Sequence, residues 1–515
     1  MNVNCYHTNR YSNTFTFLCL FLCWCVLPFQ NIFAQNADIQ RYEYTDNGKE
    51  YYGCIPLDTN GMLLKTYDKR KQTSKKNNVY TFIKYDTTFK ILDSIDVVQP
   101  ARKSAYLNYS TKENVYNLAY QNSGIYNLSV IYGKTSKVEY YTGKFPKHTI
   151  INTMRAVGSY VYFLGYIKDL PILIGKNTTD NEMTFFKIIP LNKNRFSILS
   201  FEVNEESGEV YIFTKDFMKN ENLIKFYVFK GKDKILEKMI QSPDPEKYIS
   251  SAYASKLSDG SYIISGTYNN TKKNPMSSVG IFLMKTNADG TTQQTKFINY
   301  LDITNFTSYL SEKQQDRIEK KQERKQNQDK ELEINYYMAP HNIIEKDGEY
   351  ILVCEAYYPT YRQECQYITT GMGTSMHCYQ VFDGFQYTHF FLLGFNENAD
   401  LLWSNSAPLH IDEKPYTVVK FLAVSQKKPN TQIVYSTWDN LFIYNYNEGD
   451  LLNQETIPFF KEEEKVLNSI NKTRYWYGNT FISYGMQRTK NKEDKEKREM
   501  FFVEKIKIST NNGTH

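Results

Sequence analysis

Short strand-like segments rich in tyrosine recur in pairs along the chain, about fifty residues apart. Each pair begins at a turn, continues as an apolar segment, crosses a polar loop and returns as a second apolar segment. The clearest copies join Asp259–Gly266 to Gly280–Lys285, and Asp347–Cys354 to Phe390–Phe395. A repeat of this length that contains only strands is typical of a β-propeller, so the sequence predicts an all-β fold.

Eight such units can be placed. The fifth shows four strands, at 249–257, 261–268, 279–286 and 292–299. We therefore predict a single β-propeller of seven or eight four-stranded blades over residues 35–510. The count stays open because the divergent copy at the N-terminus could instead complete one blade together with the C-terminus. Two stacked all-β domains are the alternative, but no linker rich in proline or glycine divides the chain.

The N-terminus has the pattern of a secretory signal peptide. Arg10 is the only charged residue in the first 34, an apolar run extends from Phe15 to Phe29, and Ala34 precedes a polar glutamine. This pattern predicts cleavage after Ala34. At the other end of the chain, residues 511–515 are expected to be a disordered tail. An uncleaved membrane anchor is the alternative, although the run is short for a spanning helix.

Composition supports a folded exported protein. Hydrophobic residues make up 41% of the chain and aromatic residues 16%, which is ample for a large core built by strand-forming residues. The formal net charge of +6 is modest for 515 residues. This charge argues neither for nor against a nucleic-acid partner, but export argues against one. No later apolar run is long enough to cross a bilayer, so we expect no transmembrane segment after cleavage.

Four cysteines follow the signal region: Cys54, Cys354, Cys365 and Cys378. An oxidising compartment favours pairing, and Cys365 and Cys378 flank one loop between two strands. We predict a disulfide between these two. The alternative is that the two cysteines bind a metal ion together with His377, but the sequence offers no second set of ligands. Cys54 and Cys354 are expected to be buried free thiols.

Two charged segments interrupt the repeat. Ser311–Leu332 has almost no apolar residues and pairs opposite charges at helical spacing, so we predict a solvated helix or mobile insertion spanning 303–334. The functional interpretation is that this segment protrudes as an arm that binds a partner. Arg488–Glu499 is expected to form a long charged hairpin tip.

The large loops are predicted to share one face. Residues 69–76, 272–273, 363–377 and 488–499 all fall between the second and third strands of a unit, on the side where neighbouring blades connect. Loops on a rigid scaffold commonly carry binding. We expect this face to be locally basic, and the residues that make it so are Lys69, Arg70, Lys71, Lys75 and Lys76. Solvated hairpin tips that oppose edge aggregation are the alternative.

The sixth unit holds the densest group of chemically active side chains. Because alternate residues of a strand share a face, Glu355 and Tyr357 should align on one strand, and Phe385, Tyr387 and His389 on the other. Such a group could bind a sugar by stacking and hydrogen bonds, or supply an acid–base pair. A buried structural network is the alternative. The ligand-binding residues predicted here are Glu355, Tyr357, Tyr361, Arg362, Asp383, Gln386, Tyr387, His389 and Trp403.

Established catalytic motifs are absent from the sequence. There is no nucleophile elbow, zinc-protease helix, P-loop or dinucleotide glycine pattern, and no histidines stand at metal-ligand spacing. We therefore predict no catalytic residues, no metal site and no cofactor.

The segment Glu355–Arg362 (EAYYPTYR), followed by Asp383–Trp403 (DGFQYTHFFLLGFNENADLLW), resembles part of an uncharacterised family of exported proteins from Bacteroidetes-type bacteria. The resemblance covers about fifty-five residues and carries no known activity. It implies residence in the periplasm or outer cell envelope.

These observations predict an exported, non-catalytic binding or scaffolding β-propeller of the cell envelope, whose partner is an envelope protein or a glycan. A carbohydrate-active hydrolytic enzyme with its site around the sixth unit is the alternative. A structural subunit of an envelope complex is a third class.

Overall fold

The computed structural model describes residues 37–509 apart from 46–48, 73–76, 102–103, 192–195, 218–221, 272–276, 329, 347, 371–372, 426–429, 460–463 and 494. The expected signal peptide and the expected tail at 511–515 lie outside the described residues. Within these residues the regular secondary structure is almost entirely β-strand. The predicted all-β class is confirmed.

The strands pair into eight antiparallel sheets, numbered here in chain order. Sheet 1 contains β2 (Lys49–Pro56), β3 (Met62–Asp68), β4 (Asn77–Tyr85) and β5 (Ile91–Pro100); sheet 2 contains β6 (Ser104–Ser110), β7 (Asn114–Gln121), β8 (Ile125–Tyr132) and β9 (Val138–Lys144). Sheet 3 contains β10 (Thr149–Val157), β11 (Tyr160–Ile167), β12 (Leu170–Asn177) and β13 (Met183–Lys187); sheet 4 contains β14 (Phe196–Asn204), β15 (Glu209–Phe217), β16 (Asn222–Lys230) and β17 (Asp233–Ile240).

Sheets 5 and 6 each have two short strands at their first position. Sheet 5 contains β18 (Tyr248–Ile249), β19 (Tyr253–Lys256), β20 (Tyr262–Asn269), β21 (Gly280–Thr286) and β22 (Thr292–Asn299); sheet 6 contains β23 (Tyr337–Pro340), β24 (Ile344–Lys346), β25 (Glu349–Thr370), β26 (Gly373–Asn396) and β27 (Leu401–Pro408). Sheet 7 contains β28 (Ala423–Val424), β29 (Thr431–Ser436), β30 (Asn440–Asn447) and β31 (Asp450–Pro458); sheet 8 contains β32 (Glu464–Tyr477), β33 (Thr480–Asn491), β34 (Lys497–Ile508) and β1 (Ala37–Thr45). The four strands predicted for the fifth unit agree with sheet 5 to within a few residues.

Local sequence explains these strands and turns. The middle strands of each sheet are covered on both faces, so they appear as continuous apolar runs, and every residue of β20 is buried. The Asp-Gly turns that open the fifth and sixth units need a left-handed residue, and Gly260 and Gly348 have φ values of 85° and 80°.

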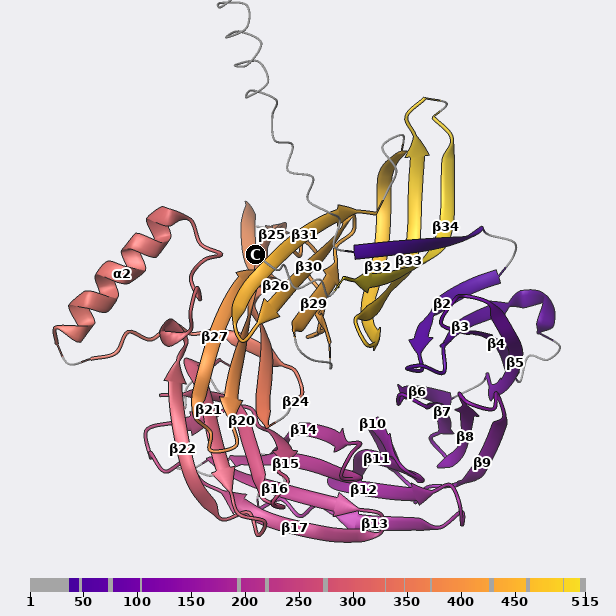
Figure 1. Ribbon diagram of the computed structural model, residues 1–515, viewed down its shortest axis with the longest axis horizontal. Helices are drawn as coiled ribbons and strands as arrows, with labels where there is room; N and C mark the ends of the chain where they lie inside the picture. The colour runs from indigo at the N-terminus through magenta and orange to yellow at the C-terminus, as the bar shows by residue number, and fades with distance from the viewer. Residues whose placement is uncertain are drawn as a thin grey trace, which may run out of the picture.

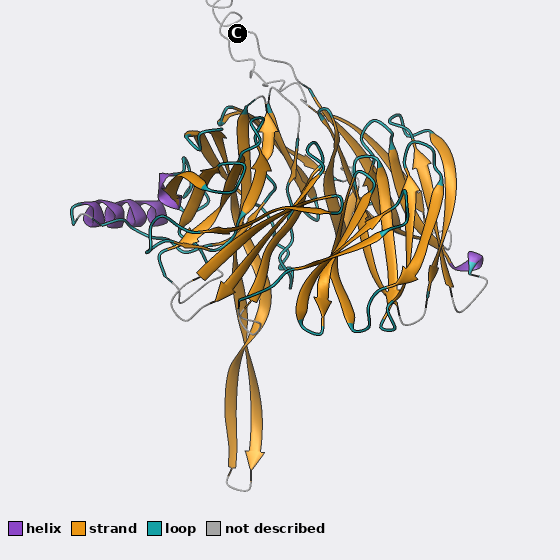
Figure 2. Cartoon of the chain, turned by 90° about the horizontal axis from the view of Figure 1, so that it is seen from below, coloured by secondary structure: helices purple, strands orange, loops and turns teal. Residues whose placement is uncertain are grey.

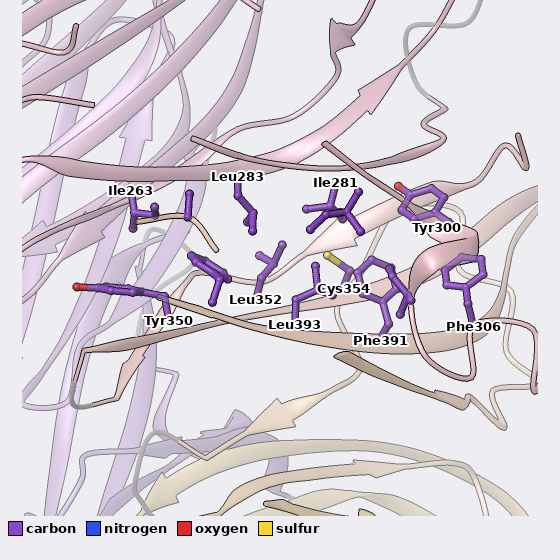
Figure 3. Packing of buried hydrophobic residues seen from close by; sticks show 14 of the residues in the cluster. Ile263, Ile281, Leu283, Tyr300, Phe306, Tyr350, Leu352, Cys354, Phe391 and Leu393 are labelled. Atoms are coloured by element: carbon purple, nitrogen blue, oxygen red, sulfur yellow. The ribbon is translucent and has the colours of Figure 1, made fainter. Parts of the chain in front are cut away.

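The sheets follow one another around a common centre (Figure 1). An apolar cluster lies between each sheet and the next, and one of them packs Met62 of sheet 1 against Val503 of sheet 8. Figure 3 shows the cluster between sheets 5 and 6, where Leu283 faces Leu352. Because the clusters include the contact between the last sheet and the first, the ring of sheets is closed.

Both ends of the chain contribute to sheet 8. Strand β1 pairs with β34 from Ala37↔Ile508 to Thr45↔Met500. Arg41 secures this pairing, because its guanidinium lies 2.8 Å from the carboxylate of Glu504. The expectation that the chain ends could share one unit is therefore confirmed.

Helix α2 (Glu312–Gln326) has no buried residue, as expected for a solvated insertion. The insertion is shorter than the predicted 303–334, because Ile303 and Phe306 pack in the core between sheets 5 and 6. Two 3₁₀ turns, η1 (Lys69–Lys71) and η2 (Tyr300–Asp302), complete the helical elements of the described chain.

The large insertions do not form one projecting surface. Strand order confirms that β3–β4, β25–β26 and β33–β34 are connections between second and third strands. However, α2 extends sideways from the rim, whereas the β25–β26 hairpin projects far beyond the body in another direction (Figures 1 and 2). Lys272 and Lys273 lie outside the described residues.

Candidate functional site

Glu355 is a buried structural carboxylate. It lies in β25 with no exposed surface. Its oxygens accept hydrogen bonds from the backbone N–H of Phe421 at 3.0 Å and of Leu422 at 3.1 Å. The Nε2 atom of His341 lies 2.7 Å from Oε1. These bonds satisfy the carboxylate and fasten the segment that leads into sheet 7.

A β-bulge at Thr388 separates Glu355 from His389. Ala356 pairs with His389, and Tyr357 pairs with Tyr387, so Thr388 has no partner across the ladder. One extra residue reverses the alternation of faces. Glu355 consequently faces sheet 7, while His389 faces sheet 5. The expectation that His389 aligns with Tyr387 is wrong, and the two groups do not converge as an acid–base pair.

His389 lies among aromatic rings. It stacks on Tyr309 with ring centroids 4.3 Å apart and meets the Phe306 ring edge-on at 4.6 Å. Its Nδ1 atom lies 2.9 Å from the Thr388 hydroxyl. Burial lowers the pKa of His389 to about 3, so the ring is neutral at pH 7.

Tyr387 and Gln386 fasten the same segment as Glu355. The Tyr387 hydroxyl donates to the carbonyl of Val419 at 2.6 Å and accepts from its N–H at 3.0 Å. The Gln386 amide donates to the carbonyl of Ile411 at 2.9 Å. The Tyr357 ring packs 5.4 Å from that of Tyr387. Tyr387 and Gln386 therefore hold the segment from Ile411 to Val419 against sheet 6, and Tyr357 packs against Tyr387.

Tyr361, Arg362 and Asp383 form a surface group at the base of the β25–β26 hairpin. The Asp383 carboxylate lies 3.0 Å from Lys414 and 3.9 Å from Arg362. Tyr361 is 57% exposed. Trp403 is remote from this group, because its indole N–H donates to Glu349 at the opposite end of sheet 6. The nine predicted residues are thus divided among separate environments.

The distal part of the hairpin, residues 361–382, is named the hairpin arm. Within the described chain its two strands pair only with each other. A disulfide joins Cys365 to Cys378 across them, which confirms the predicted pairing. Its exposed side chains include Tyr367 at 75%, Met376 at 58% and Tyr379 at 44%. Apolar groups are therefore held outside the body on a covalently closed ribbon.

Cys54 and Cys354 are buried and free, as expected. Burial raises the pKa of both thiols, which makes them unreactive.

The basic residues near η1 are largely neutralised. Lys69 pairs with Glu50 at 2.9 Å, Arg70 with Asp68 at 2.9 Å, and Lys71 with Asp96 at 2.8 Å. The sequence predicted a locally basic loop, because Glu50 and Asp96, which pair with its cations, lie on neighbouring strands. Lys75 and Lys76 lie outside the described residues.

The structure contains a polar cavity of about 300 Å³ that the sequence did not predict. It is lined by first-strand regions of sheets 2, 4, 5 and 6, including Tyr109, Glu202, Tyr253 and Glu345. Arg155 lies 3.5 Å from Glu202. The only indication of this cavity in the sequence was a charged residue within the first strand of a unit. The residues that surround such a charge are known only when the sheets are packed together.

Among the residues that the structure describes, no group of three or more histidine, cysteine or acidic side chains is arranged to hold a metal ion. No described helix is long and apolar enough to cross a membrane.

Comparison with known proteins gives no match to a family model and none to a curated protein. Solved structures with a similar arrangement include polysaccharide lyase Uly1, at 11% identity and a TM-score of 0.38, over 90% of this chain and 100% of that chain. The β-propeller domain of Vanderwaltozyma polyspora Nup133 aligns at 9% identity and a TM-score of 0.39, over 85% and 99%. The WD40 domain of Toxoplasma gondii coronin aligns at 8% identity and 0.33, over 92% and 88%. At these scores the likenesses carry no functional argument.

Proposed function

We propose that the chain is a single eight-bladed β-propeller. Its eight sheets are antiparallel meanders, apolar clusters join each to the next, and the last sheet combines both chain ends. A last blade shared by the two ends resists opening of the ring, because separating the blades requires β1 to leave β34.

We further propose that this propeller is an exported, non-catalytic binding or scaffolding protein of the cell envelope, residing in the periplasm or outer envelope. The hairpin arm is the observation that carries the proposal. It has two open edges, exposed tyrosines and a disulfide that limits its motion. Tyrosine is enriched at protein interfaces, and an open strand edge can add a strand from a partner. The proposed partner is therefore an envelope protein.

The geometry gives less support to a carbohydrate-active hydrolase at the sixth unit. Such an enzyme needs two carboxyl groups that flank a substrate. Here Glu355 is already bound by backbone donors, and Asp383 forms ion pairs at the surface.

Crosslinking of the mature protein in its native envelope, followed by identification of the captured proteins, tests the proposal. Gln363 and Gln380 pair across the arm, so a variant that joins them by Asn-Gly removes the tip without altering the body. Tyr379→Ser is the point variant, and Tyr140→Ser is its matched control, because both tyrosines are 44% exposed.

The expected result is a reproducible protein partner that is lost with the shortened arm, reduced by Tyr379→Ser and retained by Tyr140→Ser. Capture of the same partner by the shortened variant would contradict the proposal. N-terminal sequencing of the mature protein tests export, and a start at Gln35 is expected.

A further inference from the structure

The polar cavity of about 300 Å³ lies where sheets that are not neighbours in the ring meet, and it is named the central cavity. Its walls include parts of β6, β14 and β24, which lie on the inner side of the ring (Figure 1). Lys112, in the β6–β7 turn of sheet 2, lies 4.0 Å from Glu205, in the β14–β15 turn of sheet 4. The Asn342 amide of sheet 6 donates to Glu202 of sheet 4 at 3.3 Å. These contacts show that side chains from separate sheets converge on one space.

Carboxylates dominate the lining of the central cavity. Four glutamates and one lysine give the lining a formal charge of −3 when all are ionised: Glu202, Glu205, Glu206, Glu345 and Lys112. Arg155 lies 3.5 Å from Glu202, and Lys112 partly balances Glu205. Glu206 and Glu345 form no ion pair within the described part of the chain. Unbalanced charge of one sign in a concave site attracts an ion of the opposite sign.

The carboxylates also act on one another across the cavity. Burial raises the pKa of Glu345, and the charge of Glu206 raises it further. Burial likewise raises the pKa of Glu205, and the charge of Lys112 offsets only part of this effect. The negative charge of the cavity is therefore not balanced by the protein that surrounds it.

Two hydroxyl groups on β19 also lack partners. Tyr253 and Ser255 both line the cavity, and their side chains share one face of the strand because the two residues are two positions apart. The Ser255 residue is only 5% exposed. Neither hydroxyl forms a hydrogen bond within the residues that the structure describes. Because a buried polar group without a partner is costly, the unused hydroxyl of Ser255 indicates that the cavity receives a polar ligand.

The groups left free in the cavity are suited to a ligand with N–H donors. Ammonium and guanidinium groups donate several hydrogen bonds and carry the positive charge that the carboxylates lack. The volume is at the lower end of the range of about 300–1,000 Å³ that is usual for small-molecule sites. It is thus large enough for an organic cation and far larger than a bare metal ion requires.

We propose that the central cavity binds an organic cation that carries ammonium or guanidinium groups. Glu206 and Glu345 supply the opposing charge, and the hydroxyls of Tyr253 and Ser255 accept hydrogen bonds from the ligand. A free polyamine and a basic side chain of a peptide share this chemistry. The site is independent of the hairpin arm, since no residue of the arm lines it.

Titration calorimetry of the mature protein tests the site with spermidine, a free polyamine, and trilysine, a basic peptide. The control probes are tetramethylammonium, which has a positive charge but no N–H donor, and calcium chloride. We expect saturable binding of spermidine, trilysine or both, weakened by added NaCl, and binding of the control probes that is weaker by about tenfold or more. Binding of spermidine alone would indicate a free polyamine as the ligand, and binding of trilysine alone would indicate a basic peptide.

Glu206→Gln and Glu345→Gln should each weaken binding by about tenfold, because a hydrogen bond to a charged group becomes a neutral one. Ser255→Ala should weaken it by about threefold. Glu182→Gln is the matched control, because Glu182, like Glu206, is an exposed glutamate between two strands but lies outside the cavity. It should leave the affinity unchanged.

Thermal melting of each variant separates a binding defect from misfolding. Three results would overturn the proposal: no saturable binding of spermidine or trilysine, binding of calcium as tight as that of either, or an equal loss of affinity in Glu182→Gln.

Discussion

Replacing Glu355 by glutamine tests whether the centre of the sixth unit is structural. The wild-type carboxylate accepts from two backbone N–H groups, those of Phe421 and Leu422, and lies 2.7 Å from His341. Glutamine retains one acceptor oxygen but places an N–H₂ group where the second oxygen stood. All three contacts reach Oε1, and only the Phe421 N–H also reaches Oε2, so glutamine can keep these bonds but makes them to a neutral oxygen and sets its own N–H₂ group against the N–H of Phe421.

The cost follows from these contacts. A hydrogen bond to a charged group contributes about 1.5–3 kcal/mol, whereas one between neutral groups contributes about 0.5–1.5 kcal/mol. The bonds to Glu355 share one oxygen and their losses are not additive, so we expect Glu355→Gln to lower the free energy of unfolding by roughly 2–4 kcal/mol. Such a loss is a large part of a typical total of about 5–15 kcal/mol.

Equilibrium unfolding in urea measures this difference, with Glu50→Gln as the control. Glu50 also pairs with a cation, but its side chain is 47% exposed, so little change is expected. Hydrogen exchange should accelerate at the amides of Phe421 and Leu422 in the Glu355 variant. A stability equal to wild type, with unchanged exchange at these amides, would refute the structural interpretation and restore Glu355 as a ligand contact.

Three further predictions concern other parts of the chain. Because burial lowers the pKa of His389 to about 3, the unfolded state binds a proton between pH 6.5 and 3 that the folded state does not. The stability that the neutral His389 provides is complete above pH 6.5 and decreases as the pH falls, by about 2 kcal/mol at pH 5. Urea denaturation at pH 7 and pH 5 should therefore show a smaller loss of unfolding free energy in His389→Phe than in wild type. Replacing Cys365 and Cys378 by serine should increase protease cleavage within the hairpin arm and leave the melting temperature of the body nearly unchanged; a large fall would show that the arm supports the body. Deleting Ala37–Thr45 removes one strand of sheet 8 and should lower the melting temperature by many degrees, whereas an unchanged temperature would contradict closure of the ring through β1.

Much of the fold was predictable because its signals are local. Short turns and apolar strands recur in each unit, with Asp-Gly at the turns of the fifth and sixth, and residues a few positions apart suffice to recognise them. The pairing of Cys365 with Cys378 was predictable for the same reason, since the two cysteines lie on adjacent strands of one hairpin. The sharing of sheet 8 by both chain ends could only be offered as an alternative.

The candidate site was less predictable. Alternation along a strand assigned His389 to the face of Tyr387, but the bulge at Thr388 reverses that face. The charge of the loop at 69–76 was overestimated, because Glu50 and Asp96 come from other strands.

By itself, the sequence determined the all-β class, the repeating unit, the disulfide of the hairpin arm and the burial of Cys54 and Cys354. Each of these depends on residues close in the chain or on hydrophobicity alone. The tertiary structure decided the closure through β1, the opposite faces of Glu355 and His389, and the polar cavity that includes Glu202 and Glu345. Those features depend on strand register and on packing between sheets, which bring together residues distant in the chain. No local pattern encodes that proximity.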